Sequence, residues 1–120
     1  MKQKTILVAE DEIFNFYYIE ELLKPMNIKA LHAKNGLEAV ELAKNNPDIL
    51  LVLMDIRMPE MDGLEATKLI KKLRPQLPVI AQTAYTSKED RENANHSGFD
   101  HYLTKPIMRN MFKEVIEKYI

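Results

Sequence analysis

The sequence contains no cysteine and only three glycines among its 120 residues. The lack of cysteine excludes disulfide bonds, thiolate zinc sites and cysteine nucleophiles. The glycines form neither a GxGxxG nor a GxxxxGK pattern, which excludes the common phosphate-binding loops of nucleotide enzymes. The longest uninterrupted apolar run, residues 49–54, is far too short to cross a bilayer.

An excess of charge of one sign is also lacking. The net charge is −1, so no broad positive field is available to attract nucleic acid or an anionic membrane. The uninterrupted apolar run before Glu10 is only four residues long, which excludes a secretion signal in this stretch. We therefore expect residues 1–120 to form one cytoplasmic domain that contacts neither nucleic acid nor membrane directly.

What the chain does contain is a regular alternation of short apolar runs with longer amphipathic segments. Residues 6–9 and 49–54 are continuous apolar runs typical of strands buried on both faces of a parallel sheet, and residues 79–81 form a third. Residues 28–33 are less uniformly apolar, which suits an edge strand, and residues 101–103 form a short fifth strand. Helical periodicity covers residues 14–23, 37–43, 64–73, 87–95 and 108–119, with Pro25 ending the first helix and Ser87 capping the fourth. The alternation predicts an α/β fold with a doubly wound, five-stranded parallel sheet.

Polar residues stand where the predicted strands end. Glu10 and Asp11 follow the first strand, Asp55 the third, Thr83 the fourth and Lys105 the fifth. With the strand order 2-1-3-4-5, the ends of the first, third and fourth strands converge at the edge where such sheets bind ligands. Taken singly, each of these residues has an ordinary structural explanation, such as helix capping or a solvated loop charge.

Taken together, they indicate a chemical site. Three converging carboxylates repel one another, and the single charge of Lys105 does not neutralise them. Carboxylates with a backbone carbonyl and water suit Mg²⁺, which commonly shares its site with phosphate oxygens. A carboxylate can also attack phosphorus to form an aspartyl phosphate, a reaction that depends on positioning and charge neutralisation. Asp55, between the expected metal and Lys105, is the predicted nucleophile, and Thr83 is expected to bind a phosphoryl oxygen.

These residues lie in segments that resemble the response-regulator receiver family of two-component signalling. The segments are VAEDE (8–12), LMDIRMPEMDG (53–63), QTA (82–84) and YLTKP (102–106), and the resemblance covers essentially the whole chain. It implies a flavodoxin-like (βα)5 fold with strand order 2-1-3-4-5. It also implies a phosphoacceptor switch that receives its phosphoryl group from a histidine kinase or phosphotransfer domain.

The resemblance implies a role for each matching residue. Asp55 corresponds to the phosphoacceptor, and Glu10 and Asp11 to the acidic pair that holds Mg²⁺ together with Asp55. Arg57 would add its backbone carbonyl to the metal site. Lys105 corresponds to the phosphate-binding lysine.

Three further residues match family positions. The peptide bond to Pro106 is usually cis in the family. Thr83 and Tyr102 match a switch pair, in which the hydroxyl moves towards the phosphate and the ring turns into the vacated space. The surface of the fourth helix, fifth strand and fifth helix would then carry the signal.

Some positions differ from the commonest family pattern. The first acid is Glu10 rather than aspartate, which keeps the charge and extends its reach. Arg57, Ala84 and Tyr85 occupy positions that tune phosphate lifetime in the family. The residues around Asp55 and Thr83, with Asn15 after the acidic pair, are similar to those in receivers of hybrid sensor histidine kinases.

Two other functions stay open at this point. A phosphohydrolase with an aspartyl nucleophile needs an acid two residues later, where this chain has Arg57, which stays protonated at neutral pH. A phosphorylation-silent interaction module would not need the complete set of site residues. Mg²⁺-dependent labelling by acetyl phosphate separates these alternatives. No motif identifies the cognate kinase, the signal or the oligomeric state.

Overall fold

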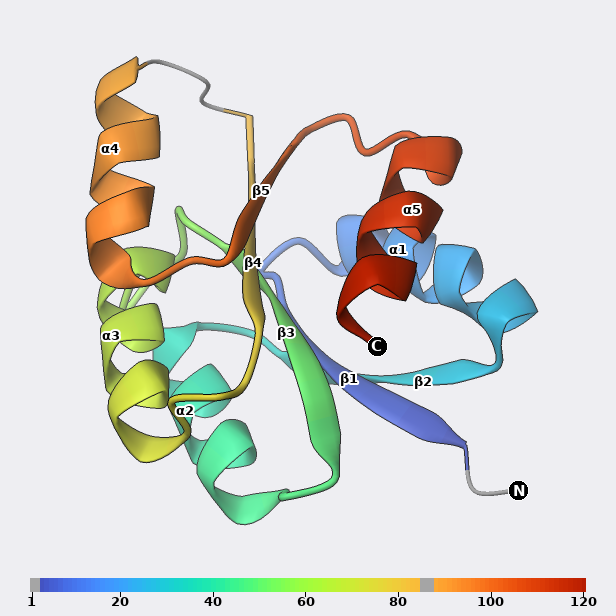
Figure 1. Cartoon of the computed structure of the whole chain (residues 1–120), viewed down its shortest axis with the longest axis horizontal. Coiled ribbons are helices and arrows are strands. Elements are labelled where there is room, and N and C mark those ends of the chain that lie inside the picture. The colour runs from blue at the N-terminus through green and yellow to red at the C-terminus, as the bar shows by residue number, and fades with distance from the viewer. Residues whose placement is uncertain (1–2, 85–87) are drawn as a thin grey trace.

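A computed structural model describes residues 3–84 and 88–120, without the side chains of residues 90, 91, 93 and 94. Its centre is one parallel sheet in the order β2-β1-β3-β4-β5 (Figure 1). The strands are β1 (Lys4–Ala9), β2 (Ile28–Ala33), β3 (Ile49–Asp55), β4 (Val79–Thr83) and β5 (His101–Thr104). The predicted fold class and strand order are confirmed.

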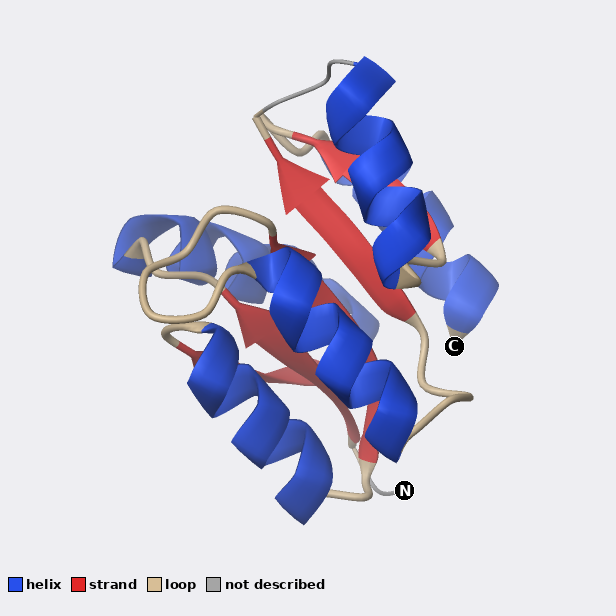
Figure 2. Cartoon of the chain, turned by 90° about the vertical axis from the view of Figure 1, so that its left-hand side faces the viewer, coloured by secondary structure: helices blue, strands red, loops and turns tan. Residues whose placement is uncertain are grey.

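Helices cover both faces of this sheet (Figure 2). They are α1 (Ile13–Leu23), α2 (Gly36–Asn45), α3 (Gly63–Leu73), α4 (Lys88–Ser97) and α5 (Arg109–Tyr119). Helices α1 and α5 lie on one face, while α2, α3 and α4 lie on the other (Figure 1). Over the described residues, no helix combines the length and apolarity needed to cross a membrane.

The sheet separates two apolar cores, and β3 contributes to both. Leu51 and Leu53 belong to the core under α1 and α5, whereas Val52 and Met54 belong to the core under α2 and α3. This burial on both faces explains the uninterrupted apolar run, because alternate residues of a strand point to opposite faces. Leu50 is the exception in this run: it is 41% exposed near the amino end of the strand.

The helix ends agree only partly with the sequence prediction. Helix α1 ends at Leu23, as predicted, but the chain does not leave helical geometry at Pro25. A 3₁₀ turn (Lys24–Met26) follows directly, with Pro25 inside it. Proline is tolerated in a first helical turn, where its missing N–H has no partner to lose. Asn27 then reverses the chain with a φ of 57° before β2. The predicted cap at Ser87 lies outside the described residues.

Candidate functional site

The polar residues predicted from the strand ends meet in one pocket at the carboxyl edge of the sheet. Its volume is about 280 Å³. The parallel direction of all five strands brings their ends to this edge, with β1, β3 and β4 adjacent in the sheet. The lining residues are Glu10, Asp11, Glu12, Asp55, Arg57, Thr83, Ala84 and Lys105.

Three carboxylates form the acidic part of the pocket. Glu10, Asp11 and Asp55 each offer an oxygen within 4.8 Å of the other two. Glu10 and Asp55 are buried, whereas Asp11 is exposed. This spacing of hard oxygen donors, open on the Asp11 side, fits a Mg²⁺ ion that keeps several waters. The donor set is therefore compatible with the metal inferred from the sequence.

Lys105 links the two buried acids. Its Nζ lies 2.9 Å from Glu10 Oε1 and 3.1 Å from Asp55 Oδ2. The backbone N–H of Lys105 donates to the carbonyl of Thr83 at 2.8 Å, and the Lys105–Pro106 peptide bond is cis. The ammonium therefore lies directly beside Asp55 in the pocket.

The charges in this pocket perturb one another. Burial and the nearby Glu10 charge raise the pKa of Asp55 to about 7, although Lys105 partly opposes both. Burial also favours a higher pKa for Glu10, but hydrogen bonds from Lys105, Asn15 and the Glu12 backbone together lower it. Burial disfavours the Lys105 ammonium, yet the two acids raise its pKa above the ordinary value. Of the two buried acids, Asp55 is therefore the harder to ionise when no cation is bound.

The backbone after Asp55 is held by a close approach of α3. The Gly63 N–H donates to the Ile56 carbonyl at 2.8 Å, and a Cβ at position 63 would lie only 2.1 Å from the Asp55 carbonyl oxygen. Glycine is needed here for space. The Arg57 N–H donates to Asp55 Oδ1 at 3.2 Å, which orients the carboxylate. The Arg57 side chain is exposed at the pocket rim.

Thr83 and Tyr102, the predicted switch pair, occupy different surroundings. Thr83 is 1% exposed and lines the acidic pocket at the end of β4. Tyr102 is half-buried on β5, packs beside Ala81 and Ile56, and lines a separate hollow with Met111 of α5. Position 85, another predicted site of tuning, lies outside the described residues.

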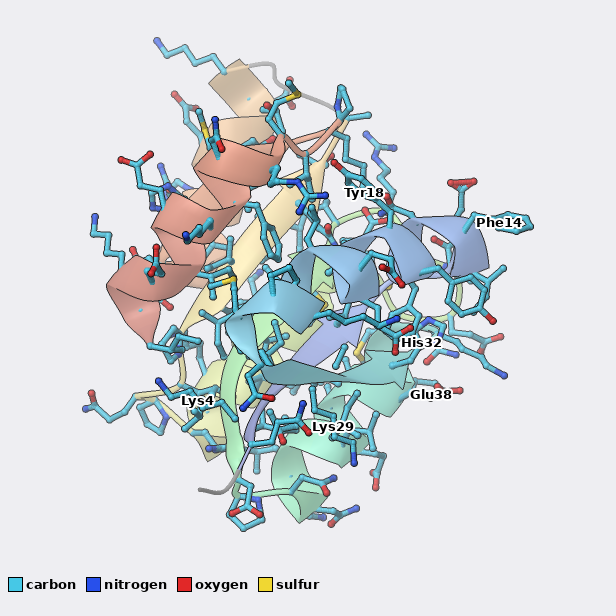
Figure 3. All side chains as sticks on the ribbon, turned by 90° about the vertical axis from the view of Figure 1, so that its right-hand side faces the viewer. Lys4, Phe14, Tyr18, Lys29, His32 and Glu38 are labelled. Carbon is cyan, nitrogen blue, oxygen red and sulfur yellow. The ribbon has the colours of Figure 1, made fainter. Side chains whose placement is uncertain are left out.

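Two contacts to Glu10 were not predicted from the sequence. The Asn15 side-chain amide, in the first turn of α1, donates to Glu10 Oε1. His32 Nε2 lies 2.7 Å from the Glu10 carbonyl oxygen, which can only accept, so this nitrogen carries the proton. The His32 ring points from β2 towards α1 and stacks on Phe16 with a centroid distance of 4.1 Å (Figure 3). Neither residue belongs to a strand-end motif. Asn15 stood out in the sequence only as part of the resemblance, and its contact with Glu10 is visible only in the structure.

Comparisons with known proteins agree with this geometry. A family model described as the response regulator receiver domain matches residues 6–117. The polar-differentiation response regulator DivK of Brucella anthropi is 39% identical, over 98% of this chain and 96% of that protein.

Solved structures give the same result. The receiver domain of sensor histidine kinase PA1611 from Pseudomonas aeruginosa, with a magnesium ion coordinated in its active site cleft, has a TM-score of 0.91. It is 31% identical and covers 98% of both chains. The co-crystal structure of the Saccharomyces cerevisiae histidine phosphotransfer protein Ypd1 with the receiver domain of Ssk1 matches with a TM-score of 0.89. There the identity is 29%, over 98% of this chain and 88% of that one.

Proposed function

Since the chain belongs to the response regulator receiver domain family, we propose that it is a signalling switch that accepts a phosphoryl group on Asp55. The observation that carries this proposal is the buried Asp55 carboxylate, with Lys105 Nζ at 3.1 Å and two further carboxylates beside it. An aspartate that merely ends a strand does not need a lysine and two further carboxylates in the same pocket.

The proposed transfer needs an ionised Asp55. Its carboxylate oxygen forms a bond to phosphorus while the phosphorus–nitrogen bond of a phosphohistidine breaks, and the leaving imidazole keeps the bonding electrons and takes a proton. Lys105 and the Thr83 hydroxyl bind phosphoryl oxygens. Mg²⁺ held by Glu10, Asp11, Asp55 and the Arg57 carbonyl would neutralise charge on these carboxylates and on the phosphoryl group.

The response to phosphorylation is proposed to pass through Thr83 and Tyr102. A phosphoryl group adds nearly two negative charges at neutral pH, which is enough to draw the Thr83 hydroxyl towards it. The Tyr102 ring, half-buried beside Ala81, would then turn and change the surface formed by α4, β5 and α5. Receiver domains are signalling modules rather than classical enzymes, and the chemistry of this proposal takes place on the chain itself.

The proposed donor is a histidine kinase or phosphotransfer domain. The match to the Ypd1–Ssk1 co-crystal structure supports a partner of this kind. We propose that the exchange takes place in the cytoplasm. The family match over residues 6–117 supports residues 1–120 as a single receiver domain.

Intact mass after incubation with acetyl phosphate tests the proposal. We expect a Mg²⁺-dependent gain of one phosphoryl group in the wild type and none in Asp55→Asn. The matched control is Asp48→Asn, an exposed aspartate before β3, which should be labelled like the wild type. Labelling of Asp55→Asn would refute the assigned nucleophile, and sustained hydrolysis of acetyl phosphate would instead favour a phosphohydrolase. A wild type that takes up no phosphoryl group even from a phosphohistidine donor would be a silent interaction module.

A further inference from the structure

The Glu10 side chain accepts hydrogen bonds at both of its carboxylate oxygens. It is 0% exposed. Its Oε1 accepts from both Lys105 and Asn15, and its Oε2 accepts from the Glu12 N–H at 3.2 Å. Of these three donors, Lys105 is shared with Asp55 and the Glu12 amide belongs to the same loop as Glu10. Asn15 is therefore the one side-chain donor among them that serves Glu10 alone.

We propose that Asn15 is a positioning residue of the metal site, holding the Glu10 carboxylate in the orientation that leaves it facing Asp11 and Asp55. The inference rests on the proposed function, because it assumes that these carboxylates bind Mg²⁺. The hydrogen bond of the Asn15 side chain goes to Glu10 and not to the Asp55 nucleophile. Asn15 therefore acts through Glu10.

The glutamate explains why such a residue is needed. Glu10 has one more rotatable bond than an aspartate would have, so its carboxylate can take more positions relative to the backbone. Lys105 alone cannot select one of them, because its ammonium must also neutralise Asp55. A second donor to Oε1 removes this freedom. Neutral amide donation adds no charge, so it orients Glu10 without competing with a cation.

The position of Asn15 in α1 supports a specific role. The buried stripe of this helix consists of Phe16, Ile19, Leu22 and Leu23. Asn15 lies one turn before Ile19 on the same side and is half-buried. An apolar residue would extend this stripe, yet an amide stands there and finds its partner in Glu10. The amide at this position is therefore explained by its hydrogen bond to the Glu10 carboxylate and not by packing in the core.

Two measurements test the inference. The first is the affinity for Mg²⁺ alone, measured by amide NMR titration. The second is the Mg²⁺ dependence of labelling by acetyl phosphate. Asn15→Ala should weaken Mg²⁺ binding about tenfold, the low end of the range for residues that orient metal ligands. The labelling rate at saturating Mg²⁺ should stay within about twofold of the wild type, because only the occupancy of the site changes. The matched control is Asn45→Ala, which removes another helical asparagine that bonds a glutamate, Glu41, far from the pocket.

A mutant cycle shows whether Asn15 acts through Glu10. In a Glu10→Ala background, Asn15→Ala should have no further effect on Mg²⁺ affinity, because no carboxylate remains to be held. An equal loss in both backgrounds would overturn the inference, as would an Asn15→Ala protein that binds Mg²⁺ like Asn45→Ala. If the wild type itself neither binds Mg²⁺ nor takes up phosphoryl, the proposed function fails and the inference fails with it.

Discussion

Asp55→Asn should stabilise the Mg²⁺-free protein in a way that grows with pH. Asp55 is 5% exposed, and its pKa in the folded protein is about 7 against an ordinary value of 3.8. A raised acid pKa means that the unfolded chain loses this proton first as the pH increases. Ionisation therefore favours unfolding, beginning near pH 4 and reaching its full effect just above pH 7.

The size of the effect follows from the gap between the folded and unfolded pKa values of Asp55. A pKa difference of one corresponds to about 1.4 kcal/mol, so the penalty should rise by about 2–3 kcal/mol between pH 5 and pH 8. Asparagine cannot ionise and escapes this penalty. The lowered pKa of Glu10 affects stability in a different pH range. It stabilises the folded protein at neutral pH, and this stabilisation is lost only as the pH falls through the acidic range, in the variant as in the wild type.

Urea unfolding in EDTA, at pH 5, 6, 7 and 8, measures the difference in unfolding free energy between Asp55→Asn and the wild type. We expect this difference to increase with pH. Saturating Mg²⁺ should remove most of the slope, because a bound cation favours the ionised carboxylate. A flat difference for Asp55→Asn in EDTA would refute the argument that this carboxyl is held largely neutral by its surroundings.

Three other changes test neighbouring parts of the site. Lys105→Met should raise the pKa of Asp55 further, so in that background the stability difference should level off at a pH above 7. An unchanged levelling-off pH would show that Lys105 does not oppose the rise in this pKa. Gly63→Ala should cost about 1–3 kcal/mol in urea unfolding and slow labelling, because its Cβ would collide with the Asp55 carbonyl; wild-type labelling would contradict this. Gln82→Met should stabilise the protein by about 1–3 kcal/mol, since the buried Gln82 amide has no partner among the described residues; a loss of stability would indicate a bound water.

The sequence was sufficient for the sheet and for the acidic pocket because both follow from one rule. Parallel strands end at the same edge, so Glu10, Asp55 and Thr83 had to meet once β1, β3 and β4 were neighbours. The contacts of Asn15 and His32 follow from no such rule. They depend on how closely α1 packs over β1 and on the register that places His32 beside Val8, just before Glu10. Periodicity gives the face of a helix but not its distance from a strand end.

Burial, and after it the neighbouring Glu10 charge, raises the pKa of Asp55, and the same crowding of negative charge favours the proposed divalent cation. With all groups ionised, Glu10, Asp11 and Asp55 carry three negative charges and Lys105 supplies one positive charge. The remaining two charges can be balanced by protons, which Asp55 accepts readily, or by one Mg²⁺ ion. Protonated Asp55 cannot attack phosphorus, whereas the cation-balanced form can. Burial disfavours the ionised form of Asp55. The proposed cation would relieve this penalty, and in that way metal binding would be coupled to the nucleophile.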